Sequence, residues 1–290
     1  MTQLPPEAAT RKNRLEATRF RIVRRVHQGR RLVQWALGPR RWAPRSHGSE
    51  PLPVVVPAIS VPIARADDAA HPLLEAGKRH NVALAVQAID GATFDAARPF
   101  SFWRVVGRLT EARGYRHGMA LNDGCVVPTV GGGVCLVSNS LFQLAAGAGW
   151  DIVERHGHSV EAVPHSGDGL WGMDATLSWP DVDLRFAPPA GLARLHARVD
   201  GDHLRLWAST TVSAPDVRLS ATADRQEGTI RENTILRWRD DRREVLTTNR
   251  KRLTHAAQRH RSCLTCGEQD DCHLVPSDVR RHLSGEAPLR

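Results

Sequence analysis

The chain has 290 residues, of which 41% are hydrophobic and 24% charged, and it carries a formal net charge of +9. This composition is typical of a globular protein with one large or two smaller domains. No apolar run reaches the ~18 residues of a membrane span, and no signal-peptide core follows the basic N-terminus. Five cysteines, an odd number, argue against a disulfide framework. We therefore expect a cytoplasmic protein with reduced thiols.

The positive charge lies in the first fifty residues, which hold twelve Lys or Arg and three Asp or Glu. Apolar residues recur there at helical spacing, from Leu15 to Trp35. Such a basic amphipathic helix can dock on the body through its apolar stripe, or lie on an anionic membrane at the inner membrane face. Nucleic acid is the least favoured partner, because no base-reading motif is present and aromatic residues are scarce.

The next elements are separated by proline and glycine. Residues 38–53 are a Pro/Gly-rich connector, and two short extended pieces broken by proline follow, at 54–56 and 59–63. A helix is predicted over 67–88, and a hairpin over 118–129 around Asp123-Gly124.

A second helix is predicted over 135–147, because its apolar residues recur at i, i+4, i+7 and i+8. Strand-like alternation follows at 175–179 and 182–186. A hairpin around Asp200-Gly201-Asp202 and further β character up to Arg237 complete the pattern.

These elements predict an α+β fold, in which the helix bearing Cys135 packs on a mainly antiparallel sheet and a β-rich part follows. The predicted segments are a basic helical segment and linker, a core domain, a β-rich extension and a cysteine-bearing tail, at 1–53, 54–190, 191–255 and 256–290.

The strongest chemical signal is a glycine run that leads into a cysteine. Gly131, Gly132 and Gly133 are followed by Val134 and then by Cys135, which opens the second helix. A helix N-terminus favours a thiolate, and the glycines allow backbone N–H groups to converge on an anion. Cys135 is therefore the candidate nucleophile.

A histidine and an aspartate follow it in the chain, each predicted to be on a strand. His158 is the candidate base, with His156 as the second choice, and Asp174 would orient the imidazole. The order Cys, His, Asp is similar to that of transglutaminase-like and papain-like cysteine enzymes, as an analogy of order and not a sequence match. The candidate ligand-binding residues are Gly131, Gly132, Gly133, Ser138 and Arg155.

Two other interpretations of this site stay open. The site could bind a ligand without catalysis. Alternatively, Cys135 could be a buried apolar residue and the glycines could serve tight packing of helix on sheet. Cys125, which has no glycine run beside it, is interpreted as structural.

Several motifs in order resemble the VanW family over about residues 75–190. The shared stretches are Phe100–Trp103, Gly114-Tyr115, Gly131–Cys135, Glu154–Ser159, Asp174–Thr176 and Asp183-Leu184. The family is named for an accessory protein of glycopeptide-resistance gene clusters, and the resemblance implies a link to cell-wall or D-amino-acid metabolism. The family usually has Gln directly after the cysteine, where this chain has Leu136.

Two functions are therefore expected. The first is a cysteine-dependent acyl transferase or amide hydrolase acting on a small-molecule, peptide-like or D-amino-acid-containing substrate. The alternative is a non-catalytic ligand-binding or accessory module of envelope metabolism.

The tail carries a second constellation. Cys263 and Cys266 form a CxxC knuckle, and Cys272 and His273 follow, a set that suits a structural zinc ion. An iron–sulfur cluster would need Cys125 or Cys135 as a further ligand. A metal-free tail or a Cys263–Cys266 redox pair also fits.

Overall fold

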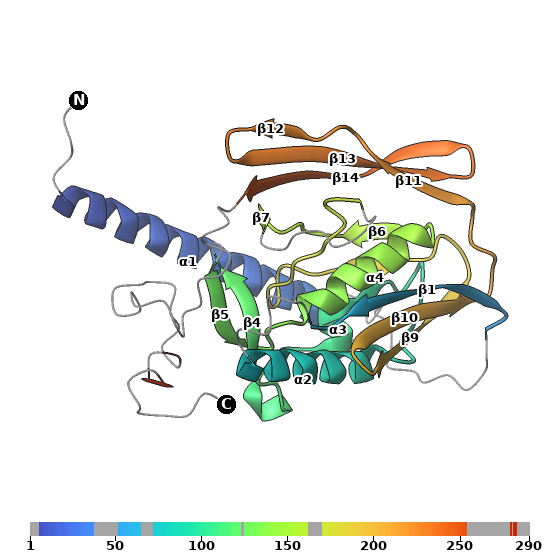
Figure 1. The fold of residues 1–290 in the computed structure, drawn as a ribbon, viewed down its shortest axis with the longest axis horizontal. Coiled ribbons are helices and arrows are strands. Elements are labelled where there is room, and N and C mark those ends of the chain that lie inside the picture. The colour runs from blue at the N-terminus through green and yellow to red at the C-terminus, as the bar shows by residue number, and fades with distance from the viewer. Residues whose placement is uncertain are drawn as a thin grey trace.

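The computed structural model describes residues 6–37, 52–64, 72–122, 125–161, 170–253, 279 and 281–282. The fold is α+β with mainly antiparallel sheets and a β-rich C-terminal part, which confirms the predicted class (Figure 1). The predicted division into four segments stays a prediction.

A four-stranded antiparallel sheet forms one layer, with the order β1-β10-β9-β2. Its strands are β1 (Val54–Pro62), β10 (His203–Thr210), β9 (Leu192–Asp200) and β2 (Thr93–Asp95). The β9–β10 hairpin confirms the turn predicted at Asp200–Asp202. The two extended pieces expected around Pro57 are one strand, whose register shifts between Val56 and Ile59. A proline, which has no N–H to donate, is tolerated at such an irregularity.

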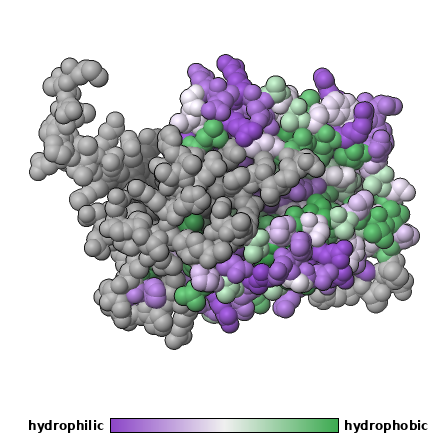
Figure 2. All heavy atoms as spheres, in the orientation of Figure 1, coloured by the Kyte–Doolittle hydropathy of each residue, from purple (hydrophilic) through white to green (hydrophobic). Residues whose placement is uncertain are grey.

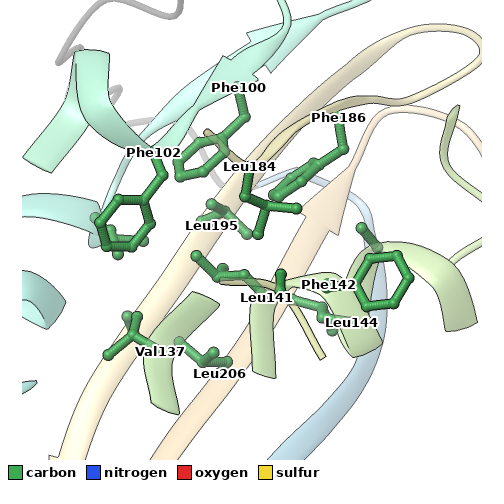
Figure 3. Packing of buried hydrophobic residues seen from close by; sticks show 14 of the residues in the cluster. Phe100, Phe102, Val137, Leu141, Phe142, Leu144, Leu184, Phe186, Leu195 and Leu206 are labelled. Atoms are coloured by element: carbon green, nitrogen blue, oxygen red, sulfur yellow. The ribbon is translucent and has the colours of Figure 1, made fainter. Parts of the chain in front are cut away.

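Helix α4 (Cys135–Gly147) has the predicted bounds and lies at the centre of the molecule, between the four-stranded sheet and the C-terminal strands (Figure 1). It contacts β1 and β10 on one side and β6 (Asp151–Glu154) and β11 (Val217–Ala221) on another. Val137, Leu141, Phe142 and Leu144 are buried in the main hydrophobic cluster (Figure 3). The helix is therefore held rigidly, which fixes the position of the residue at its start.

Aromatic side chains fill the adjoining part of the core. Phe100 stacks on Phe186 with ring centroids 4.7 Å apart (Figure 3). Trp150 stacks on the ring of Phe186 with centroids 5.7 Å apart. Phe94 meets all three edge-on. Phe100 belongs to β3 (Phe100–Ser101) and Phe186 to β8 (Arg185–Ala187), which pair antiparallel beside β6.

Helix α2 (Pro72–Ile89) covers β9 and the hairpin formed by β4 (His117–Asn122) and β5 (Cys125–Val130). The helix ends one residue beyond the predicted range, and residues 67–71 of that range lie outside the described part of the chain. Pro72 suits a first helical turn because its missing N–H has no intrahelical role there. This hairpin confirms the one predicted around Asp123-Gly124. Asp123 and Gly124 themselves lie outside the described part of the chain.

A buried carboxylate organises the short helix α3 (Phe102–Val106). Asp183 is fully buried; it accepts hydrogen bonds from the Ser101 hydroxyl at 2.5 Å and from the Trp103 backbone N–H at 3.1 Å. Burial and the nearby Glu154 carboxylate raise the pKa of Asp183 to about 6, although these hydrogen bonds act in the opposite direction. The motifs Phe100–Trp103 and Asp183-Leu184 therefore meet at this carboxylate, which holds the start of α3.

The C-terminal strands form a second sheet with the order β11-β13-β14-β7, and β12 (Arg225–Glu227) pairs with β13. Strands β13 (Ile230–Arg239) and β14 (Arg242–Leu253) are long and antiparallel, whereas β14 pairs parallel with the two-residue β7 (Val160–Glu161). Hydrophilic side chains gather along the upper edge of the molecule, over these strands (Figure 2).

The prediction of strands at 175–179 and 182–186 is wrong in part. Only β8, at residues 185–187, is a strand, and Ser178 and Val182 form an isolated bridge. The backbone N–H of Ala175 donates to the Asn139 side chain and that of Thr176 donates to the carbonyl of His156, so these groups do not pair with a neighbouring strand. The alternating pattern therefore reflects a loop that is buried on one side.

The basic N-terminal segment forms helix α1 (Pro6–Leu37), as its periodicity predicts. Its C-terminal half contacts the body: Arg31 forms an ion pair with Glu154 at 2.6 Å, and the Trp35 ring meets Trp179 edge-on at 5.3 Å. None of the helices in the described ranges is long and apolar enough to cross a bilayer.

Candidate functional site

Cys135 is the first residue of α4 and is partly exposed. The chain reaches it from β5 through Gly131–Gly133, of which Gly131 and Gly133 have φ of +83° and +94°, a backbone conformation that glycine adopts without strain. Since Cys135 is the first residue of α4, its backbone N–H has no acceptor within the helix. The residue therefore sits where the helix dipole favours a negative charge.

The glycines also allow close packing. A Cβ atom on Gly132 would lie 2.3 Å from the carbonyl group of Gly118, and one on Gly133 would lie 2.3 Å from Cγ of Lys78. These contacts explain the residue type at both positions without a ligand. A role of the glycines in ligand binding stays a prediction.

His158 links Cys135 to Asp174. The Nδ1 of His158 lies 2.5 Å from Oδ2 of Asp174, and the backbone N–H of His158 donates to the same oxygen at 3.1 Å. Since an ionised carboxylate only accepts, Nδ1 carries the proton, and Nε2 is left for Cys135, whose side chain hydrogen bonds to His158. The structure thus brings the three predicted residues together in one chain of contacts.

The electrostatics of the imidazole follow from these partners. Burial alone would lower the pKa of His158, but the hydrogen bonds and charges of Asp174 and Cys135 raise it to about 9. Burial would likewise raise the pKa of Asp174, but His158 and Lys251 hold it well below its usual range. At neutral pH the site therefore contains an imidazolium beside a carboxylate.

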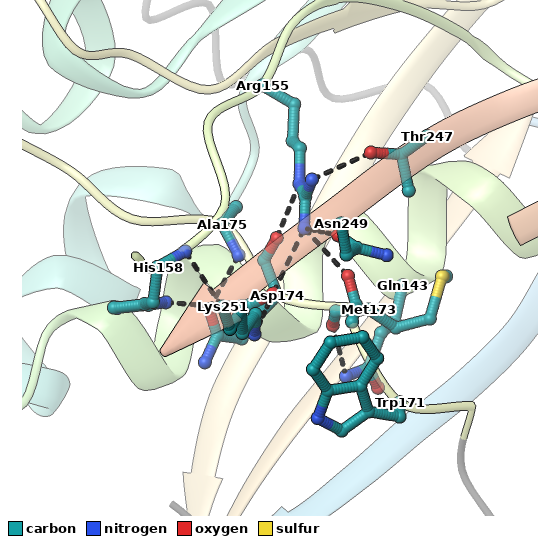
Figure 4. A network of polar contacts seen from close by, with 12 residues as sticks. Gln143, Arg155, His158, Trp171, Met173, Asp174, Ala175, Thr247, Asn249 and Lys251 are labelled. Carbon is teal, nitrogen blue, oxygen red and sulfur yellow. Dashed lines mark hydrogen bonds and ion pairs between the residues drawn. The ribbon is translucent and has the colours of Figure 1, made fainter. Parts of the chain in front are cut away.

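Asp174 is held by two buried cations on its other oxygen. Oδ1 lies 2.8 Å from Nζ of Lys251 and 3.0 Å from Nη2 of Arg155, and the exposed fractions of these three side chains are 10%, 6% and 7%. The carboxylate is therefore fixed in orientation, with Oδ2 left for His158 (Figure 4).

Arg155 is a hub of this network (Figure 4). Its guanidinium donates to the carbonyls of Asp174 and Gly172, to the hydroxyl of Thr247 and to the amide oxygen of Asn249. Thr247, Asn249 and Lys251 are alternate residues of β14, so one face of that strand supplies them all. The predicted ligand-binding residue Arg155 is thus occupied by protein partners.

Helix α4 holds the segment that bears Asp174. Ser138 donates its hydroxyl proton to the carbonyl of Ala175 at 2.6 Å, Asn139 accepts from the N–H of Ala175 at 2.8 Å, and Gln143 donates to the carbonyl of Met173 at 3.0 Å. Ser138, predicted to bind ligand, is fully buried and serves this contact. The helix that positions Cys135 therefore also positions Asp174.

His158 and Asp174 lie in connecting segments and not on strands, contrary to the prediction. His158 lies between β6 and β7, and Asp174 lies in the segment before β8. His156, the second-choice base, is turned toward Glu154 at 3.3 Å, with 48% of its side chain exposed.

Sequence reasoning did not identify the β14 residues. Thr247, Asn249 and Lys251 alternate as polar residues at the end of a strand, and this pattern is usual for a solvent-facing surface. Asn249 and Lys251 are nevertheless buried, because this face of β14 lies against Arg155 and Asp174, which are far away in the chain.

The predicted metal ligands Cys263, Cys266, Cys272 and His273 lie outside the described residues, as does the side chain of Cys125. Within the described ranges, no three His, Cys, Asp or Glu residues are placed to hold a metal ion. Zinc binding by the tail stays a prediction.

Comparison with known proteins shows what part of the chain is similar to other proteins. Residues 77–206 match the family described as VanW like protein. The chain is 40% identical over 111 residues to the uncharacterized protein YoaR of Bacillus subtilis (strain 168), covering 38% of this chain and 35% of that protein. It is 32% identical over 116 residues to the vancomycin B-type resistance protein VanW of Enterococcus faecalis (strain ATCC 700802 / V583), covering 39% of this chain and 42% of that protein.

The match thus spans less than half the length of either relative. No solved structure matches the chain. Residues 77–206 contain Cys135, His158 and Asp174 but not the β14 residues that hold Asp174. Residues 77–206 are thus similar to the VanW-like family, which confirms the resemblance carried by the motifs.

Proposed function

We propose that this protein is a cysteine-dependent acyl transferase or amide hydrolase. Its substrate would be peptide-like or contain a D-amino acid, and its role would be linked to cell-wall or vancomycin-resistance metabolism, since one relative is named for vancomycin resistance. The observation that carries the proposal is the contact chain from Cys135 through His158 to Asp174.

The chemistry follows from the protonation states. The sulfur of Cys135, as a thiolate beside the imidazolium, would add to the carbonyl carbon of the substrate. His158 would then donate its Nε2 proton to the leaving amine or alcohol as the C–N or C–O bond breaks, leaving a thioester on Cys135. Water or an amine, deprotonated by the now neutral His158, would attack the thioester and regenerate the thiolate.

The backbone at the start of α4 could stabilise the oxyanion. The N–H groups of Leu136 and Val137 donate to the carbonyls of Gly133 and Val134, whereas the N–H of Cys135 has no acceptor within the described part of the chain. A preorganised donor next to the nucleophile is what a tetrahedral oxyanion requires.

One observation favours the alternative, a non-catalytic ligand-binding or accessory module. Leu136 stands where the family usually has Gln, and Leu136 is partly buried against the main hydrophobic cluster. If that Gln supports catalysis in relatives, this chain lacks its contribution. An accessory module would use the same site but would need no reactive thiol.

Covalent trapping separates the two. The protein is incubated with the p-nitrophenyl esters of N-acetyl-D-alanine and N-acetyl-L-alanine, and intact mass and release of p-nitrophenolate are followed. We expect a burst of release and an acyl adduct on Cys135, faster with the D-ester. Cys135→Ala should abolish both, and His158→Gln should slow them by about 10²-fold or more.

Labelling with iodoacetamide in mildly acidic buffer is the companion measurement. Cys135 should be alkylated much faster than the other four cysteines, and the rate should fall in His158→Gln. Slow, equal labelling of all five cysteines, together with no ester adduct, would contradict the proposal that Cys135 is a nucleophile. Fast labelling of Cys135 without an adduct would exclude these two esters as substrates but leave the thiol reactive.

A further inference from the structure

Helix α1 contacts the body through one narrow face. Arg24 donates to the hydroxyl of Ser178 at 3.0 Å and Gln28 to the carbonyl of Trp179 at 3.2 Å, and Arg31 and Trp35 make the contacts described above. The spacing i, i+4, i+7, i+11 places these four residues within about 60° of the helix circumference.

Four exposed apolar residues of α1 lie on the opposite side. Ile22, Val26, Val33 and Leu37 are 59%, 64%, 54% and 82% exposed. They also fall within about 60°, in an arc centred about 180° from the docked face. We call these four residues the outer stripe. Helix α1 therefore docks on the body, but among the described side chains the docked face is mostly polar, with Trp35 as its apolar contact.

Positive charge borders the outer stripe. Arg25 and Arg30 are exposed and flank it on either side, and α1 as a whole contains nine Lys or Arg and two Asp or Glu. Figure 1 shows α1 running outward from the body, so that its N-terminal part lies beyond the sheets. A large apolar stripe with basic flanks is the pattern of a helix that lies in a membrane interface.

We propose that α1 lies on an anionic membrane surface, with the outer stripe in the headgroup region and the docked face holding the body. Anionic lipid suits both features, because it attracts the arginines and takes up the apolar side chains. A second copy of the chain would bring two strongly positive helices together. A nucleic acid would meet the arginines but leave the outer stripe exposed.

The test uses the full chain and vesicles of phosphatidylcholine, with or without phosphatidylglycerol. The wild-type protein should co-sediment with the anionic vesicles and not with the neutral ones. The bound fraction should fall steeply as salt is raised, because exposed charges are screened over ~8–10 Å at physiological ionic strength.

A matched pair of variants isolates the outer stripe. Ile22→Gln, Val26→Gln, Val33→Gln and Leu37→Gln together keep the charge and use a good helix former, and should weaken binding about tenfold or more. The control combines four other exposed apolar residues, as Leu73→Gln, Val153→Thr, Val212→Thr and Val245→Thr, and should bind like the wild type.

Three outcomes would overturn the proposal. The first is no co-sedimentation with anionic vesicles at low salt, and the second is binding that the outer-stripe substitutions leave unchanged. The third is a dimer, detected by light scattering, that the outer-stripe substitutions convert to a monomer. This result would show that the outer stripe binds a second copy of the chain.

Discussion

Lys251 and Asp174 form a buried ion pair, with Nζ and Oδ1 2.8 Å apart, although β14 lies well outside the segment that matches the VanW-like family. The part of the site inside the matching segment and the part that orients Asp174 thus come from different regions of the chain. A fragment limited to residues 77–206 would contain Cys135, His158 and Asp174 but would lack Lys251.

The first prediction concerns the charge state of His158. Its folded-state pKa of about 9 lies above the ordinary histidine value of about 6.5. The protonated ring therefore stabilises the fold fully below about pH 6.5, and this contribution is lost as the pH rises through about 9. The difference in unfolding free energy between wild type and His158→Gln should shrink over that window in denaturant titrations.

His203→Gln, at an exposed position of β10, is the control for loss of an imidazole. In an NMR titration, Cys135→Ala should lower the pKa of His158, because one hydrogen bond and one charge that raise it are removed. An unchanged pKa in Cys135→Ala would contradict the contact between the two side chains.

The second prediction concerns the buried charges. Asp174→Asn leaves Arg155 and Lys251 without their carboxylate partner, and should lower the unfolding free energy by about 3–5 kcal/mol. The exposed pair of Arg250 and Glu232 is the control, since its side chains are 72% and 42% exposed. Glu232→Gln should change the unfolding free energy by about 1 kcal/mol or less. Equal effects of the two substitutions would contradict the burial of Asp174.

The third prediction concerns the glycine run. Gly132→Ala places a Cβ against the backbone of Gly118 and should destabilise the protein by about 1–3 kcal/mol or more. Gly147→Ala, at a helical position with nothing within 4 Å of the added Cβ, should be neutral or stabilising by about 0.4–1 kcal/mol. Thermal unfolding of both variants measures the difference, and a harmless Gly132→Ala would show that the packing does not require glycine.

The fourth prediction concerns the tail. If Cys263 and Cys266 bind zinc, protein purified from zinc-replete cells should carry about one zinc per chain, and the double substitution to Ser should abolish it. Metal analysis of the purified protein, with its melting temperature before and after a chelator, tests this. A metal-free protein whose melting temperature is the same with and without the chelator would contradict zinc binding by the tail.

The sequence predicted those elements whose signals are local. Helix α4 has the expected bounds because its apolar periodicity is bordered by glycines, and the β9–β10 hairpin forms where Asp200-Gly201-Asp202 interrupts two alternating runs. The order of Cys135, His158 and Asp174 was sufficient to select three residues that the fold brings together.

The sequence did not predict the features that depend on contacts between residues far apart in the chain. The segment around Ala175 alternates like a strand because one side is buried, but its N–H groups are bound by Asn139 and His156. Lys251 is polar at the end of a strand, and nothing nearby in the chain indicates that it is buried next to Asp174.

Helix α4 has a consequence for how the site could open. It begins at Cys135 and binds both residues that flank Asp174, so the thiol and the carboxylate belong to one rigid unit. The imidazole between them belongs to another segment, which joins a strand of the central three-stranded sheet to a strand of the C-terminal sheet. Opening of the site would therefore leave the spacing of sulfur and carboxylate constant, whereas the imidazole can move only if its segment releases the hydrogen bond from the His158 N–H to Asp174 Oδ2.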